Sequence, residues 1–212
     1  MSRAKFALLA LALSVCAVPV HASWLAPFIS ELHYDNEGKD VGEFVAVTGP
    51  SGLDLSGWEL VLYNGGDGRP YGAVELNGVL DSAAGGLAEA AWPFVGIQNG
   101  PDAVALISPL DAVVDFIAYE AGVIATEGAA QDLSARLLSV VEDGGTPIGW
   151  SLQRSGTSSA EAWTAAPATP GMLNAGLLQV DAREVPTAGV TTLWVAGWLL
   201  MMFSRRAHPR AA

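Results

Sequence analysis

Through the middle of the chain, short apolar segments alternate with clusters of Gly, Asp, Asn and Pro. This pattern predicts strands at residues 28–34, 43–48, 58–63, 71–76, 91–97, 103–107, 112–119 and 149–154. Turn residues separate the segments, most clearly at 49–52, 64–68, 99–102 and 143–145. Short strands and turns at this spacing predict an all-β domain, either a β-sandwich or a barrel.

Apolar and polar positions also alternate inside the predicted strands. In the segment 58–63, Trp58, Leu60 and Leu62 fall on one face, whereas Val61 and Tyr63 share the other face with a glutamate. A period of two residues is typical of a strand that is buried on one side.

One stretch departs from this period. Leu133, Leu137, Leu138 and Val141 recur at helical spacing. They predict a short surface helix within a long loop.

Residues 1–22 have the order of a secretory signal peptide. Arg3 and Lys5 precede an apolar run that begins at residue 6, and cleavage is predicted after Ala22. An uncleaved membrane helix is the alternative, although Pro19 interrupts the run. Cys16, the only cysteine, leaves with the signal peptide, which excludes disulfides, thiolate metal sites and cysteine nucleophiles from the mature chain.

The end of the chain is predicted to be a membrane or sorting segment. Residues 177–187 form a linker with the motif Val185-Pro186, residues 188–204 form an apolar helix, and residues 205–212 form a basic tail that contains Arg205 and Arg206. The arginines follow the positive-inside rule, which places the tail in the cytoplasm and the body outside.

This order resembles the PEP-CTERM type of bacterial sorting signal, although its usual Val-Pro-Glu-Pro reads Val-Pro-Thr-Ala here. A simple C-terminal anchor is the alternative. In both cases the chain is expected to cross the inner membrane and to reside in the cell envelope, on the cell surface or in the extracellular matrix.

The charge of the chain limits its partners. All 22 Asp and Glu residues lie between residues 23 and 185, against five Lys and Arg, so this region carries a formal charge of −17, compared with −12 for the whole chain. Such a surface repels phosphate backbones and anionic lipid headgroups. Direct binding of nucleic acid is therefore not expected, whereas cations and basic partners suit this charge.

Several ordered motifs between residues 26 and 174 resemble the bacterial lamin tail domain. They are the segments 29–36, 40–45, 53–58, 60–64, 149–153 and 168–171, together with Trp163 and Asn174. The resemblance implies an immunoglobulin-like β-sandwich without a disulfide, over residues 23–176. It also implies an accessory binding module, of the kind sometimes joined to nuclease or phosphatase domains, and does not imply one function.

Candidate catalytic groups are few. After removal of the signal peptide only His33 and His208 remain, and His208 lies in the basic tail. A histidine in a predicted strand is more often a packing residue than a base. The chain lacks the Gly-x-Ser-x-Gly, His-Glu-x-x-His and Gly-Lys-Ser motifs. These observations favour a protein that is not an enzyme.

Two binding sites are conceivable from the residue types. Hard oxygen ligands gather at Glu31, Asp35, Asp40 and Glu43, for which a solvated acidic loop is the leading interpretation and a Ca²⁺ site is the alternative. Exposed aromatic side chains form the other candidate, either as a binding patch or as ordinary packing, and they are Tyr63, Tyr71, Trp92, Tyr119 and Trp150.

The sequence therefore predicts an exported, surface-displayed or membrane-anchored interaction or structural module of lamin-tail type. Its partner is expected to be a protein or a polysaccharide, with the C-terminal helix contacting the membrane. The alternatives are an accessory domain that acts with a separate extracellular nuclease or phosphatase, and a Ca²⁺-dependent adhesion module.

Overall fold

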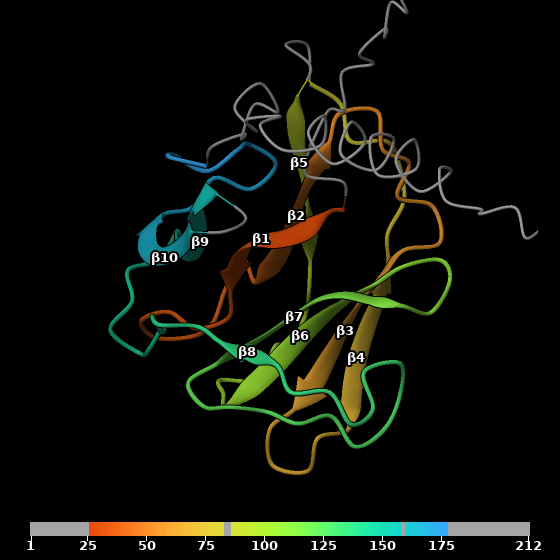
Figure 1. The fold of residues 1–212 in the computed structure, drawn as a ribbon. Coiled ribbons are helices and arrows are strands. Elements are labelled where there is room, and N and C mark those ends of the chain that lie inside the picture. Colours follow the sequence, from red (N-terminus) through yellow and green to blue (C-terminus); the bar gives the residue numbers. More distant parts are fainter. Residues whose placement is uncertain (1–25, 83–85, 158–159, 178–212) are drawn as a thin grey trace, which may run out of the picture. The chain divides into compact units, whose positions relative to one another are not determined.

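The strands of the protein pair into two separate sheets in the computed structural model, which describes residues 26–82, 86–157 and 160–177 (Figure 1). These ranges contain strands, turns and loops but no helix. A helix long and apolar enough to cross a membrane is therefore not found among the described residues. The predicted signal peptide 1–22, helix 188–204 and basic tail 205–212 lie outside the described residues, as does the linker beyond Leu177.

Five strands form each sheet. The first sheet contains β1 (Phe28–His33), β2 (Phe44–Pro50), β5 (Leu87–Pro93), β9 (Trp150–Thr157) and β10 (Ala160–Pro167), in the order β10–β9–β1–β2–β5. The second sheet contains β3 (Glu59–Asn64), β4 (Pro70–Glu75), β6 (Asp102–Ile107), β7 (Val113–Tyr119) and β8 (Arg136–Leu137), in the order β4–β3–β6–β7–β8. Neighbouring strands are antiparallel except for β7 and β8, which are parallel.

The main hydrophobic core contains side chains from both sheets. The first sheet contributes Ile29, Leu32, Val45, Val47 and Leu152, and the second contributes Leu60, Leu62, Val104, Leu106 and Ile117. Tyr34 and Tyr119 stack with ring centroids 4.1 Å apart. Each large side chain buried here stabilises the fold by about 1.5–3 kcal/mol. The all-β prediction is confirmed.

A second apolar cluster lies on the other face of the second sheet. Val61 and Tyr63 of β3 pack there with Val123, Ala125 and Ala130 from the long connection after β7. The amide of Ala130 donates to the Tyr63 hydroxyl at 3.2 Å. This connection covers the face that the alternating pattern assigned to solvent, which is why β3 is buried on both sides.

The predicted helix around residues 133–141 is wrong. Arg136–Leu137 is the short strand β8, and its neighbour Leu138 is the buried member of the set, whereas Leu133, Leu137 and Val141 are exposed. The amide of Leu138 donates to the carbonyl of Ala118 in β7 at 2.8 Å. Pairing with a strand therefore takes the backbone hydrogen bonds that a helix would need.

The other strand predictions are confirmed within a few residues, with one omission. The segment predicted at 91–97 forms β5 four residues earlier, at Leu87–Pro93, and the segment at 149–154 continues to Thr157. The strand β10 was not predicted, because its several alanines and its threonine give no clear apolar period.

An ionic network connects the sheets at the edge formed by β8 and β10. Asp115 of β7 accepts hydrogen bonds from Arg154 of β9 at 3.1 Å and from Arg136 of β8 at 3.2 Å. Both arginines also pair with Glu161 of β10. Asp115 further accepts the amide of Ile29 at 3.1 Å, beside a register shift in β1.

Candidate functional site

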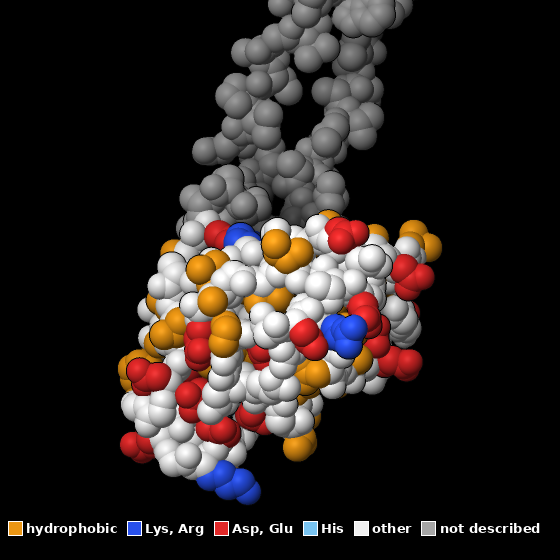
Figure 2. Space-filling model, turned by 90° about the horizontal axis from the view of Figure 1, so that it is seen from below, with side chains coloured by type: hydrophobic (Ala, Val, Ile, Leu, Met, Phe, Trp, Pro, Cys, Tyr) orange, Lys and Arg blue, Asp and Glu red, His pale blue; other side chains and the backbone are white. Residues whose placement is uncertain are grey.

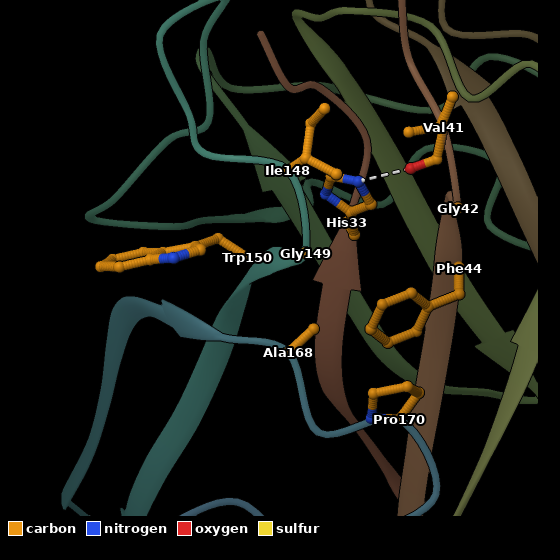
Figure 3. Close-up of a pocket in the computed structure, with 9 residues that line it drawn as sticks. All are labelled: His33, Val41, Gly42, Phe44, Ile148, Gly149, Trp150, Ala168 and Pro170. Carbon is orange, nitrogen blue, oxygen red and sulfur yellow. Dashed lines mark hydrogen bonds between the residues drawn. The ribbon is translucent and has the colours of Figure 1, made fainter.

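A pocket of about 380 Å³ opens at one end of the first sheet, where three separate segments meet (Figure 3). The strand ends contribute His33 of β1, Phe44 of β2 and Trp150 of β9. The remaining lining residues come from the loops beside these strands and after β10, and they are Val41, Gly42, Ile148, Gly149, Ala168 and Pro170. The volume lies within the usual range for small ligand sites.

The walls of the pocket are apolar. Trp150 lies on one side, Phe44 and Pro170 lie on the opposite side, and His33 and Ile148 lie between them (Figure 3). Ile148 is 60% exposed and Trp150 is half-buried, whereas Phe44 is buried. Among the described lining residues, the polar side-chain groups are the imidazole of His33 and the indole N–H of Trp150.

Both ring nitrogens of His33 are engaged inside the protein. Nδ1 lies 3.0 Å from Oε1 of Glu142, and Nε2 lies 3.1 Å from the carbonyl oxygen of Val41. Because both partners are acceptors, the protonated ring satisfies both contacts. Burial alone lowers the pKa of His33, but the hydrogen bond and negative charge of Glu142, with the contact to Val41, raise it above its ordinary value. His33 is thus not positioned as a free base.

Glu142 is itself a buried structural acceptor. Its side chain is fully buried, and Oε2 accepts the amides of Tyr34 at 2.6 Å and Asp35 at 3.0 Å. The Tyr34 hydroxyl donates to the Glu142 carbonyl and accepts its amide. These bonds attach the segment before β9 to the end of β1 and thereby position the back of the pocket.

Glu31, the first residue of the predicted Ca²⁺ site, lies in a different polar cluster. It is fully buried, and Oε1 accepts the hydroxyl of Ser151, the side-chain amide of Gln153 at 3.2 Å and the backbone amide of Thr169 at 2.8 Å. Asn174 adds hydrogen bonds from its side-chain amide to the carbonyls of Ser30 and Arg154. This cluster attaches the segment after β10 to β1 and β9.

Asp35 and Asp40 are the two predicted ligands that the structure brings together. Burial, followed by the charge and hydrogen bond of Asp40, raises the pKa of Asp35. Asp40 also accepts the amide of Asn36 at 3.4 Å and the side-chain amide of Asn99 at 3.2 Å. The contact with Asn36 closes the loop between β1 and β2 on itself, and the contact with Asn99 attaches it to the loop between β5 and β6.

The fourth predicted ligand, Glu43, faces elsewhere, because its Oε2 accepts the amide of Gly96 at 2.8 Å. In the described ranges, no group of three or more His, Cys, Asp or Glu residues is arranged to hold a metal ion. The predicted set of Glu31, Asp35, Asp40 and Glu43 therefore does not converge. Glu31 and Glu43 each bond elsewhere, apart from the pair formed by Asp35 and Asp40.

The predicted aromatic patch is also dispersed. Tyr63 and Tyr119 are fully buried, and Tyr71 and Trp92 are half-buried against the main core. Trp150 alone of these five lines the pocket. For Tyr63 and Tyr119, the packing alternative is confirmed.

Sequence reasoning missed the other walls of the pocket. Phe44 and Pro170 belong to segments that were considered for their resemblance to the lamin tail domain, and Ile148 precedes a predicted strand. One signal was available: Ile148 and Trp150 flank a glycine shortly after the Gly144-Gly145 turn, so two large apolar side chains occupy a loop end.

Comparisons of the chain with family models, with curated proteins and with solved structures find no significant match.

Proposed function

We propose that this chain is an exported interaction module without enzymatic activity, an immunoglobulin-like sandwich of the lamin-tail type that is displayed at the cell envelope. One observation carries the proposal. The pocket is lined mainly by apolar side chains, and His33, its titratable lining residue, has both ring nitrogens bonded within the protein. A pocket of this kind favours binding over acid–base chemistry, which needs a titratable group that is free to exchange a proton with the ligand.

The positions of the buried carboxyl groups support the same proposal. Glu31 and Glu142 accept hydrogen bonds from backbone and side-chain donors that hold neighbouring segments, and Asp115 pairs with two arginines. Groups used in this manner act as scaffold. The motifs that resemble the lamin tail domain fit scaffold roles as well, since Glu31 of the first motif bonds to Thr169 of the closing motif.

Display outside the cytoplasm is proposed from the two ends of the chain. The signal-like residues 1–22, the apolar run 188–204 and the arginines that follow it together favour export and retention by the C-terminal segment. The surface charge agrees with a solvated, surface-exposed body. On the face drawn in Figure 2, acidic side chains are widely spread and basic ones are few.

Protease treatment of spheroplasts tests this proposal. Cells expressing the full chain with an epitope at its C-terminus are converted to spheroplasts and treated with proteinase K. We expect the body to be digested while a short tagged fragment stays protected, with a cytosolic marker intact as control. Protection of the whole chain until lysis contradicts display outside the cytoplasm.

The absence of enzymatic activity has a separate test. The full chain is incubated with DNA or with p-nitrophenyl phosphate, in the presence of Ca²⁺ or Mg²⁺. We expect no turnover above that of a heat-treated sample. Reproducible turnover that disappears in Glu31→Ala or His33→Ala, in variants that keep the β circular-dichroism signal, overturns the proposal in favour of an enzyme.

A further inference from the structure

We infer that the pocket is the docking site of a basic protein segment, which inserts one large apolar side chain between Trp150 and Phe44. Lys or Arg residues beside that side chain then meet the acidic loops at the rim. The inference rests on the proposed function as a binding module and adds the chemistry of the partner.

The lining selects an apolar group. The lining side chains offer a ligand few hydrogen bonds, because the imidazole of His33 is bonded to Glu142 and Val41 and the indole N–H of Trp150 is the other polar group among them. The carbonyl of Gly149 likewise accepts the amide of Ala168 at 2.8 Å. A sugar would lose water from several hydroxyl groups and find at most the Trp150 indole N–H in return, which is costly. An aliphatic or aromatic side chain has no such cost and gains from leaving water.

The pocket also exposes apolar surface that lacks a covering segment among the described residues. Ile148 is 60% exposed and Val41 is 46% exposed, and they come from different loops. The half-buried indole of Trp150 adds a flat aromatic wall beside them. Contiguous apolar surface assembled from separate segments is typical of a contact site.

The loops that lead into the pocket, called the rim here, carry negative charge. Glu37 is exposed and Asp40 is partly exposed on the loop that leads to Val41, and Asp143 is exposed on the loop that leads to Ile148. The amide of Glu37 donates to the carbonyl of Thr146 at 2.9 Å, which joins the two loops. Lys39 is the basic residue on these loops, so the acidic residues outnumber it.

Charge complementarity then determines the class of partner. The region 23–185 has 22 acidic against five basic residues, so anionic lipids and nucleic acids are repelled from it. A protein segment that carries Lys or Arg around an apolar residue satisfies both the pocket and the rim. The rim charges accelerate and orient the encounter, and the apolar side chain supplies most of the affinity.

The experiment uses the full chain in zwitterionic lipid nanodiscs and a dye-labelled peptide, Gly-Lys-Lys-Trp-Lys-Lys-Gly, with binding measured by fluorescence polarisation. Two further peptides replace Trp by Ser, or all Lys by Glu. Ile148→Ser removes a pocket wall that is largely exposed, so the fold is not at risk. Leu110→Ser, at a residue that is 89% exposed and does not line the pocket, is its matched control.

We expect the Lys-Trp peptide to bind, and its affinity to fall about tenfold in Ile148→Ser and not in Leu110→Ser. Glu37→Gln is expected to weaken binding about twofold, whereas Glu75→Gln, an equal charge change at an exposed position of β4, leaves it unchanged. The Trp-to-Ser and Lys-to-Glu peptides are expected to bind at least tenfold more weakly.

Other outcomes overturn the inference. If the Trp-to-Ser peptide binds the native chain as tightly as the Lys-Trp peptide does, the interaction depends on charge alone. The same conclusion follows if the Lys-Trp peptide binds Ile148→Ser as tightly as it binds the native chain. Equal binding of the Lys-to-Glu peptide removes the role of the rim. Binding of an envelope oligosaccharide that depends on Ile148, with no peptide binding, replaces the partner class but leaves the proposed binding module standing. If nothing binds, the pocket is not a docking site. The proposed display of the chain outside the cytoplasm is still tested separately by the digestion of spheroplasts.

Discussion

Nδ1 of His33 lies 3.0 Å from Oε1 of Glu142, with the two side chains only 3% and 0% exposed. Nε2 of the same ring contacts the carbonyl of Val41 at 3.1 Å. The protonated imidazole therefore connects β1, the segment before β9 and the loop that carries one wall of the pocket. This arrangement makes the pocket sensitive to the protonation of His33.

The first prediction concerns pH. Because the pKa of His33 is raised above 6.5 in the folded state, the folded chain holds this proton more tightly than the unfolded chain. Its contribution to stability is complete below about pH 6.5 and is lost as the pH rises through the folded-state pKa. We expect urea denaturation to show a free energy of unfolding that falls on going from pH 6 to pH 9. Ionisation of Glu89 contributes to the fall in the same range, so we expect a smaller fall in His33→Gln, and a fall as large as that of the native chain argues against His33 as an origin.

Glu89 gives a second prediction with its own pH range. Its Oε2 accepts the hydroxyls of Ser30 and Thr48, and its Oε1 has no hydrogen-bond partner among the described residues. Burial raises its pKa from 4.5 to about 7, so the ionised form destabilises the folded state as the pH rises through this range. We expect Glu89→Gln to be more stable than the native chain by about 1–2 kcal/mol at pH 8.

At pH 5 this difference should largely disappear, because Glu89 is then protonated in the folded chain. Glu75→Gln, at an exposed position, serves as the control in the same denaturation series. A stability gain for Glu89→Gln that is equal at pH 5 and pH 8 contradicts the assignment to ionisation.

The ionic network between the sheets provides a third prediction. Asp115→Ala leaves the guanidinium of Arg154, whose side chain is 8% exposed, without the Asp115 carboxylate at 3.1 Å. Removal of one partner from a buried pair is expected to cost about 3 kcal/mol of unfolding free energy. Arg69→Met, which breaks an exposed pair with Glu127, should cost less than about 1 kcal/mol. Equal losses in the two variants would show that burial of the pair is unimportant.

A fourth prediction concerns the segment that follows β10. Asn174 donates to the carbonyls of Ser30 at 2.7 Å and Arg154 at 3.2 Å, and it accepts the Thr169 hydroxyl at 3.0 Å. We expect Asn174→Ala to lose about 2 kcal/mol and to accelerate hydrogen exchange at the Thr169 amide.

Exchange in the central strand β6 should stay unchanged in this variant. Thr164→Ala, at an exposed position of β10, is the control and is expected to exchange as the native chain does. Uniform acceleration throughout the chain would indicate general destabilisation and not local release of the segment.

Whether the sequence revealed a strand depended on how that strand is buried. The core strands β3 and β6 were found because their apolar residues are dense and are bounded by Gly and Asp. The strand β10 was not predicted because Ala and Thr carry little apolar signal. Its position is determined by pairing with β9 along its whole length. The helix predicted around Leu137 failed because pairing with β7 overrides a four-residue spacing.

The site was harder to predict, since it is assembled from positions far apart in the chain. Glu31 and Asp40 are nine residues apart, yet one contacts Thr169 and the other Asn99. Their closeness in the sequence suggested that they share one ligand, whereas in the folded chain they contact different segments. Trp150 was identified as a candidate contact residue, but its opposite wall, Phe44, depends on the pairing of β1 with β2 and of β1 with β9.

The intact mass of the protein recovered from the cell envelope tests export and display most directly. Cleavage after Ala22 predicts a chain that begins at Ser23 and is found with the membrane fraction, or in the medium if the C-terminal segment is removed. A polypeptide that retains residues 1–22 and is recovered with soluble cytosolic proteins contradicts an exported binding module.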